Sequence, residues 1–269
     1  MAPKITVQLY SVRNEAEKDY EGTMRRIAEM GYENVEPAGF PGCTVEKAAK
    51  IYKELGLSAP SQHGALPVGD HKNEIIEKAL LLDTKYIFTG CPPDYPNSFK
   101  SADAIKRCAD IFSEASSIAG EHGIQVGIHN HTFEMMDIEG RPAYEIFMEN
   151  TPAEVLWEAD IYWVCEGGRS IPAFIECIAE RGKVLHFKDG LITNKNAIGL
   201  KDKAMEQFAE KCTFLPAGSG DIDLSAAFNS VEHAQYICVE LDAFNGDMME
   251  AVSQSYQYLT DHGIAEGRV

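Results

Sequence analysis

The sequence predicts an α/β fold, a single (β/α)8 TIM barrel that spans residues 1–269. Short apolar, β-branched runs recur eight times along the chain, and helical patterns lie between most of them. Strands and helices that alternate without a linker or a change in composition are typical of parallel βα units. The length of 269 residues also suits one barrel of this kind. A doubly wound parallel sheet is the alternative architecture.

The eight expected strands are short, and most carry polar residues near their carboxyl ends. They cover residues 5–10, 32–36, 57–63, 85–89, 124–131, 155–161, 184–188 and 236–241. Between them, apolar residues recur at intervals of three or four, which indicates helices whose apolar faces pack on the strands. The clearest of these patterns cover residues 20–30, 45–55, 102–121 and 244–263. Gly31, Gly56 and Gly123 stand where the first three should end.

The segment between the last two expected strands is longer than one βα unit requires. Its first part, residues 189–202, is polar and contains glycine and asparagine. We therefore expect an insertion at about residues 189–215, which forms an extra helix or a lid above strand 7.

Charge and composition narrow the classes of function. The chain has 24 Lys and Arg against 42 Asp and Glu, a formal net charge of −18. Such a charge disfavours binding to nucleic acid or to an anionic membrane surface. No apolar run approaches the roughly 20 residues of a membrane span, and the N-terminus lacks the apolar core of a secretion signal. The seven scattered cysteines suit a reducing cytoplasm. The sequence is also compatible with a homo-oligomer.

Polar and ionisable residues lie at the carboxyl ends of most expected strands, where barrel enzymes place their chemistry. Glu240 lies within an apolar run, and a lone buried carboxylate is costly unless a partner or a metal neutralises it. A hydrogen-bonded core residue is the alternative for any single position. The His, Asp and Glu residues at adjacent strand ends together favour a metal site: Glu36, His63, His129, His131, Glu134, Asp160, His186 and Glu240.

Five segments resemble the sugar phosphate isomerase/epimerase family of the xylose isomerase-like TIM barrel superfamily. They are residues 7–13 (VQLYSVR), 31–36 (GYENVE), 129–134 (HNHTFE), 186–189 (HFKD) and 239–241 (VEL).

The resemblance implies one divalent metal, Mn, Co, Mg or Zn, held by residues from strands 5 to 8. Asp160, His186 and Glu240 match three of the family's ligands. Where the family has a glutamate at the end of strand 5, this chain has His129. We expect Glu134, rather than His129, to be the fourth ligand, because three carboxylates and one imidazole match the family's ligand set.

The resemblance further implies a sugar isomerase or epimerase that removes a proton next to a metal-polarised carbonyl of a sugar or keto-sugar. The expected catalytic residues are Glu134, Glu240, His131 and Lys188. The expected substrate-binding residues are Gln8, Glu36, His63, His129 and Trp163. One alternative is a lyase or dehydratase of the same superfamily, acting on an inosose or a 3-keto-glycoside. A second is a metal-dependent hydrolase, since the His129–x–His131 pair is similar to that of metal-dependent amidohydrolases, or a non-catalytic sugar-binding protein.

Overall fold

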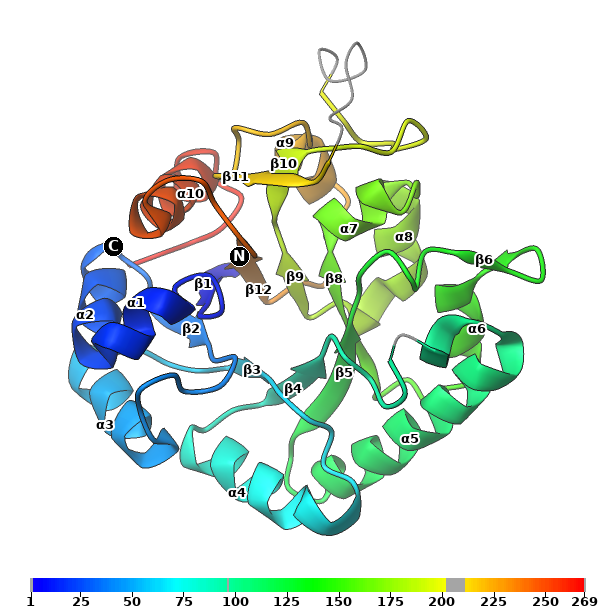
Figure 1. Ribbon diagram of the computed structural model, residues 1–269, viewed down its shortest axis with the longest axis horizontal. Helices are drawn as coiled ribbons and strands as arrows, with labels where there is room; N and C mark the ends of the chain where they lie inside the picture. Colours follow the sequence, from blue (N-terminus) through cyan, green and yellow to red (C-terminus); the bar gives the residue numbers. More distant parts are fainter. Residues whose placement is uncertain (1, 96, 202–210, 269) are drawn as a thin grey trace.

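An eight-stranded parallel sheet nearly closes into a barrel in the computed structural model, which describes residues 2–95, 97–201 and 211–268 (Figure 1). Its strand order is β2-β1-β12-β9-β8-β5-β4-β3. The end strands β2 and β3 are joined by backbone hydrogen bonds from Val35 N to Ser58 O (2.9 Å) and from His63 N to Pro37 O (2.8 Å). This closure confirms the (β/α)8 prediction and excludes the doubly wound alternative.

The barrel strands are β1 (Lys4–Gln8), β2 (Asn34–Glu36), β3 (Ser61–His63), β4 (Tyr86–Thr89), β5 (Gln125–His129), β8 (Leu156–Asp160), β9 (Val184–His186) and β12 (Tyr236–Val239).

Helices surround the strands as an outer layer (Figure 1). The expected helices at 20–30, 45–55, 102–121 and 244–263 correspond to α2, α3, α5 and α10. Gly56 ends α3 with a positive φ of 67°, a conformation that costs glycine little. The helices are α1 (Arg13–Lys18), α2 (Tyr20–Glu29), α3 (Val45–Leu55), α4 (Lys72–Leu81), α5 (Ala102–Gly120), α6 (Ala143–Glu149), α7 (Ile161–Glu166), α8 (Ile171–Ile178), α9 (Leu224–Phe228) and α10 (Met248–Asp261), with 3-10 turns η1 (Gly69–His71), η2 (Asn97–Phe99) and η3 (Ala179–Arg181). None of the helices in the described residues is both long and apolar enough to span a membrane.

A small apolar cluster, separate from the main core, fills one level of the barrel. It consists of Tyr86, Phe88, Leu156, Val184 and Cys238, which come from β4, β8, β9 and β12. Gly127 lets Phe88 pack there, because a Cβ at this position would lie 2.6 Å from the Phe88 ring. Buried polar residues follow this cluster toward the carboxyl ends of the strands, so the barrel interior changes from apolar to polar along its axis.

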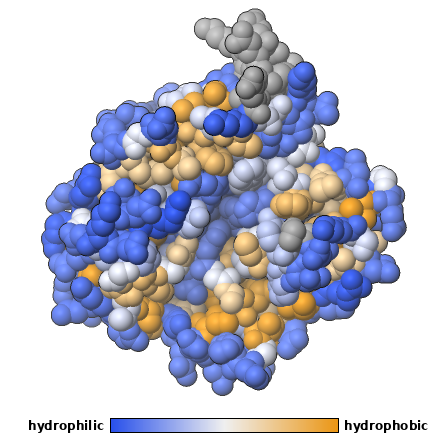
Figure 2. Space-filling model, viewed as in Figure 1, coloured by the Kyte–Doolittle hydropathy of each residue, from blue (hydrophilic) through white to orange (hydrophobic). Residues whose placement is uncertain are grey.

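Two short antiparallel pairs extend beyond the barrel strands. The first, β6 (Asp137–Ile138) with β7 (Arg141–Pro142), follows β5. The second, β10 (Asp189–Leu191) with β11 (Thr213–Leu215), lies in the insertion that we expected at about 189–215. Residues 202–210 of that insertion lie outside the described residues. The face of the molecule in Figure 2 is hollowed near its centre, and hydrophilic residues lie in the hollow.

Candidate metal centre

The carboxyl ends of β5, β8, β9 and β12 bring together four side chains that could bind a metal. One ligand atom each from His129, Asp160, His186 and Glu240 lies within 4.8 Å of the others. All four residues are buried. Strand register sets part of this arrangement, because Asp160 lies directly opposite His186 in the β8–β9 pair. The group therefore contains two imidazoles and two carboxylates, contributed by four consecutive barrel strands.

Asp160 is held rigidly at the end of β8. Its Oδ1 caps α7 by accepting hydrogen bonds from the backbone N–H groups of Tyr162 (2.9 Å) and Trp163 (3.3 Å). Its backbone N–H donates to Asn130 Oδ1 at 3.1 Å. Only Oδ2 faces the other members of the group, at 3.8 Å from His129 Nε2. Asp160 thus offers one preoriented oxygen. Burial, opposed by the Lys188 ammonium, raises the pKa of Asp160 to about 6.

The ammonium of Lys188 lies between three carboxylates. Its Nζ is 2.8 Å from Asp160, 2.8 Å from Glu240 and 2.9 Å from Asp242. Burial would lower the pKa of this lysine, but the three carboxylates outweigh burial and raise the pKa well above its ordinary value. The ring of Trp163 lies 5.5 Å from the same Nζ. Lys188 is therefore a fixed positive charge that shares two carboxylates with the candidate metal centre.

A second layer of buried carboxylates, Glu36 and Glu158, lies on the other side of the two imidazoles. His129 Nδ1 is 3.0 Å from Glu158 Oε2, and His186 Nε2 is 3.0 Å from Glu36 Oε1. Gln8 Nε2 donates to Glu36 at 2.8 Å. The structure thus places Gln8 and Glu36 beneath the site, where their polar groups pair with each other and with His186. This position does not support the substrate contacts that the sequence predicted for them.

Sequence reasoning missed Glu158, which contacts both His63 and His129. The available signal was the alternation of side chains along a strand, which puts Glu158 and Asp160 on the same face of β8. Burial would lower the pKa of His63, but the carboxylates of Glu158 and Glu36 outweigh it and raise that pKa.

Glu134 lies beyond the end of β5 and does not join the four-residue group. Its Oε2 accepts the backbone N–H of His131 at 2.8 Å. This hydrogen bond turns the carboxylate back toward its own loop, and the structure places His129, rather than Glu134, beside Asp160. Burial raises the pKa of Glu134 to about 7. The four-residue group therefore contains His129 and not Glu134, which we expected to be the strand-5 ligand.

His131 and Trp163 lie next to each other, with ring centroids 5.8 Å apart. The buried Nδ1 of His131 and the buried Nε1 of Trp163 have no hydrogen-bond partner in the described part of the chain. Burial lowers the pKa of His131 to about 4, so its imidazole is neutral at pH 7. Two unpaired polar atoms in one place suit a polar ligand group.

The donor set and the charge balance of the site fit a divalent ion. Four ligands of mixed nitrogen and oxygen type are typical of zinc and related transition metals. Lys188 is the one lysine or arginine within 4 Å of the carboxylates of this region among residues 2–95, 97–201 and 211–268. Those carboxylates are Glu36, Glu158, Asp160, Glu240 and Asp242. A bound cation would neutralise part of this costly excess of negative charge.

A pocket of about 630 Å³ opens above this group. Its polar wall includes His63, His129, His131, Glu240 and Asp242, and its other wall includes Tyr10, Ala38, Ala65 and Cys91. The volume lies within the range of small-molecule sites. The pocket therefore connects the candidate ligands to the outside.

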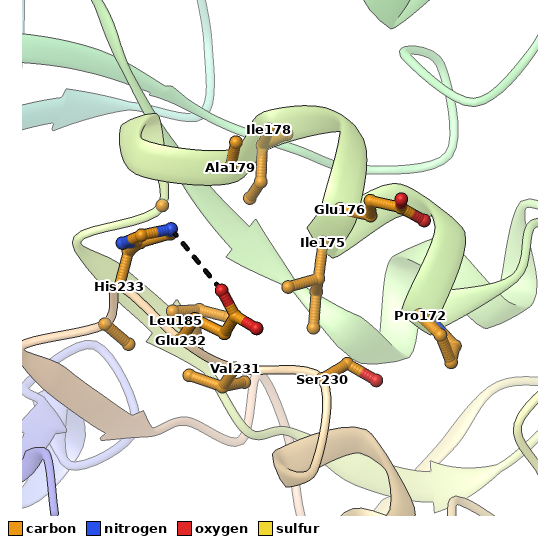
Figure 3. A pocket seen from close by; sticks show the side chains of 12 residues that line it. Pro172, Ile175, Glu176, Ile178, Ala179, Leu185, Ser230, Val231, Glu232 and His233 are labelled. Carbon is orange, nitrogen blue, oxygen red and sulfur yellow. Dashed lines mark ion pairs between the residues drawn. The ribbon is translucent and has the colours of Figure 1, made fainter.

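A second cavity, of about 410 Å³, lies between α8 and the segment that joins α9 to β12 (Figure 3). Ile175, Ile178 and Val231 line it, and Glu232 pairs with His233 at 3.8 Å on its wall. In the described residues, none of the strand-end side chains that we expected to be functional lines this cavity. The larger pocket is therefore the candidate site.

Comparison with known proteins places this geometry in a structural context. No protein-family model matches the chain. No curated protein matches it in sequence. Solved structures do match, and they share the barrel over nearly the whole chain. A sugar phosphate isomerase/epimerase from Parabacteroides distasonis is 21% identical, with a TM-score of 0.74 over 99% of this chain and 96% of that protein.

Other matches carry different activities. The IolI protein with a bound zinc atom is 15% identical, with a TM-score of 0.68 over 97% of this chain and 98% of its own. The probable 3-DHS dehydratase AsbF from Bacillus anthracis is 14% identical, with a TM-score of 0.67 over 96% of this chain and 98% of its own. The chain shares the (β/α)8 barrel fold of these sugar phosphate isomerase/epimerase and xylose isomerase-like structures. That fold, expected from the sequence resemblance, is confirmed.

Proposed function

We propose that the protein is a divalent-metal-dependent isomerase or epimerase of a sugar or keto-sugar. The observation that carries the proposal is the convergence of His129, Asp160, His186 and Glu240 within 4.8 Å of one another, with His129 and Glu240 lining an open pocket. The zinc atom bound to the similar IolI protein supports a divalent ion in this fold. The similarity to a sugar phosphate isomerase/epimerase supports the reaction class.

The proposed ligands are His129, Asp160, His186 and Glu240. A divalent ion bound by them would polarise a carbonyl of the substrate and acidify the neighbouring C–H. Burial would raise the pKa of Glu240, but Lys188 and His186 outweigh it and hold this pKa well below its ordinary value. The Glu240 carboxylate is therefore ionised and lines the pocket, so it can accept the carbon-bound proton.

Other residues bind and orient the substrate. The neutral His131 and the indole N–H of Trp163 can exchange hydrogen bonds with sugar hydroxyls, since neither atom has a partner in the described residues. His63 lines the pocket and can contact a further hydroxyl. The Lys188 ammonium stays protonated and stabilises negative charge that develops on the substrate oxygen beside it. Glu134, with its pKa of about 7, holds the His131 backbone in place and can exchange a proton near neutral pH.

A lyase or dehydratase is the second candidate, and the histidine at the end of β5 favours it. An epimerase needs a proton acceptor on each face of one carbon, whereas the candidate group pairs the Glu240 carboxylate with the His129 imidazole instead of a second glutamate. Elimination needs one base to take the proton from carbon and one acid to protonate the departing oxygen. Glu240 can serve as the base, and His63, which lines the pocket and whose pKa the carboxylates of Glu158 and Glu36 raise, can donate the proton. The similarity to the probable dehydratase AsbF agrees with this alternative.

The test combines metal analysis with turnover. The purified protein, supplied with Mn²⁺, Co²⁺, Mg²⁺ or Zn²⁺ and then desalted, should retain about one ion per chain. It should convert a member of a panel of free ketoses, keto-glycosides and inososes, and chelation should stop that conversion. Product analysis separates isomerisation and epimerisation from elimination.

Two variants test the ligand set in the same experiment. His129→Ala should lose the ion, whereas Glu134→Gln should keep it. His71→Ala, which changes an exposed histidine on η1, is the matched control. Absence of metal from the wild-type protein under all four conditions contradicts the proposal. Loss in Glu134→Gln together with retention in His129→Ala reverses the ligand assignment.

A further inference from the structure

The buried carboxylates of Glu158 and Glu36 each contact one imidazole of the candidate metal centre. We infer that they are positioning residues, which fix the nitrogen that His129 and His186 present to the ion. The inference rests on the proposed metal site. It removes Glu36 from the set of expected substrate contacts and gives Glu158 a role that the sequence did not suggest.

The two nitrogens of His129 face opposite layers of the site. Nδ1 lies 3.0 Å from Glu158 Oε2, and Nε2 lies 3.8 Å from Asp160 Oδ2. An imidazole nitrogen at 3.0 Å from a carboxylate donates its proton to that carboxylate. Glu158 therefore holds the proton on Nδ1 and leaves the lone pair of Nε2 pointing toward Asp160.

His186 repeats the arrangement with its nitrogens exchanged. Nε2 lies 3.0 Å from Glu36 Oε1, and Nδ1 lies 2.9 Å from Glu240 Oε2. Gln8 and Ser61 also donate to Glu36, so this carboxylate is fixed from three sides. Each nitrogen of His186 therefore lies beside a carboxylate. An ion bound beside Glu240 would displace the proton on Nδ1, and Glu36 would keep the proton on Nε2.

Burial separates these carboxylates from the substrate. Glu36 and Glu158 are both 0% exposed, and neither lines the pocket of about 630 Å³. In the described residues, the imidazoles of His63, His129 and His186 contact these two carboxylates, and the side chains of Gln8, Ser61 and Cys238 contact Glu36 as well. A carboxylate that accepts the second N–H of a metal-binding histidine orients the ring and increases its basicity, and its loss typically weakens metal binding 10- to 100-fold.

A second ion in the inner layer is the competing interpretation, because His63, His129, Glu158 and His186 also lie within 4.8 Å of one another. Such an ion would take the same His129 and His186 rings that the outer site needs, and each shared ring would have to lose both ring protons. Glu158 already lies at hydrogen-bond distance from His129 Nδ1, and Glu36 from His186 Nε2, so we favour positioning over a second ion.

The tautomers of the wild-type protein give a direct test that needs no variant. Two-bond ¹H–¹⁵N spectra of the Zn²⁺-loaded protein should show His129 protonated at Nδ1 and His186 protonated at Nε2. The reverse tautomer at both rings overturns the inference. Loss of both protons from the rings, together with two ions per chain, establishes the inner ion instead and also overturns it.

Metal affinity, measured by competition with a fluorescent chelator, supplies the second readout. Glu158→Gln and Glu36→Gln keep the volume and one acceptor oxygen but lose the charge, and each should weaken Zn²⁺ binding 10- to 100-fold. Glu166→Gln is the matched control, because Glu166 accepts two hydrogen bonds from Thr193 and none from an imidazole ring. It should bind Zn²⁺ as the wild type does.

The outcomes separate this inference from the proposed function. A wild-type protein that binds no metal contradicts the proposed function. It also contradicts the positioning role of Glu36 and Glu158, because that role depends on the metal site. A wild-type protein that binds one ion, with affinity unchanged in both glutamine variants, leaves the proposed function intact and overturns the positioning role alone.

Discussion

Replacing Lys188 with methionine should destabilise the metal-free protein and increase the stabilisation that a divalent ion provides. The ammonium of Lys188 is fully buried and contacts Asp160, Glu240 and Asp242 at 2.8, 2.8 and 2.9 Å. Methionine fills similar space without the charge, so the three carboxylates would lose the cation that neutralises them. The ion and the ammonium also share Asp160 and Glu240, so removing one cation leaves more negative charge for the other.

The magnitude follows from the cost of breaking a buried ion cluster. Removing one partner of a buried pair typically costs about 3–5 kcal/mol. For a chain of this size, that loss lowers the melting temperature by on the order of 10 °C. An ion present at 100 times its Kd stabilises a protein by about 2.7 kcal/mol, and each further tenfold gain in affinity adds about 1.4 kcal/mol. Saturating metal should therefore raise the melting temperature of Lys188→Met more than that of the wild type.

Thermal unfolding with a chelator and with saturating Mn²⁺ measures both effects. Lys78→Met is the control, because Lys78 forms an exposed pair with Glu74 whose loss should change stability by less than about 1 kcal/mol. If Lys188→Met and the wild type have the same melting temperature in the presence of chelator, the ammonium does not neutralise the carboxylates. If Mn²⁺ shifts both proteins equally, the ammonium and the ion do not share ligands.

Three further predictions concern single residues. Glu240→Gln should lower turnover at least 10²- to 10⁴-fold. The variant should still fold, because glutamine keeps the volume and Lys188 retains two other carboxylates. Near-normal turnover per folded molecule contradicts the role of Glu240 as the base. The folded pKa of Glu134 is raised from 4.5 to about 7, so the wild type should lose up to about 3 kcal/mol relative to Glu134→Gln as the pH rises from about 4.5 to 7. Urea unfolding at pH 5 and pH 8 checks this, and parallel pH dependence of the two proteins is the opposing result. Cys91 is exposed and lines the pocket, so maleimide should block turnover in the wild type but not in Cys91→Ser. Equal inhibition of both proteins would show that the reactive thiol is another cysteine.

The fold and three of the four candidate ligands could be predicted from the sequence. Asp160 ends β8, His186 ends β9 and Glu240 directly follows β12, so the barrel topology alone brings them to one edge. The ends of the strands can be recognised in the sequence because apolar runs mark the strands. A polar residue within such a run can then be identified as a candidate site residue. The closing of β2 onto β3 needed no information beyond the count of eight βα units.

The strand-5 ligand could not be predicted in this way. His129 is the last residue of β5, whereas Glu134 lies in the loop beyond it, and the sequence does not say which way a loop carboxylate turns. In the structure, the hydrogen bond to the His131 backbone turns it away from the other ligands. Glu158 was missed for a different reason, since its pairing with His63 and His129 depends on strands distant in the sequence.

The two layers of buried charge differ in what neutralises them, and this difference bears on how the metal is taken up. The outer carboxylates Asp160 and Glu240 contact the Lys188 ammonium, whereas the inner carboxylates Glu36 and Glu158 contact imidazoles. A buried carboxylate with a cation or an N–H donor beside it costs far less than a bare one. If the proposed metal site is correct, the barrel could therefore fold before it binds a metal, with the imidazoles already oriented by the inner layer. The ion would then compete with one lysine rather than organise the site, so the proposed activity should return when metal is added back to chelated protein, without a refolding step.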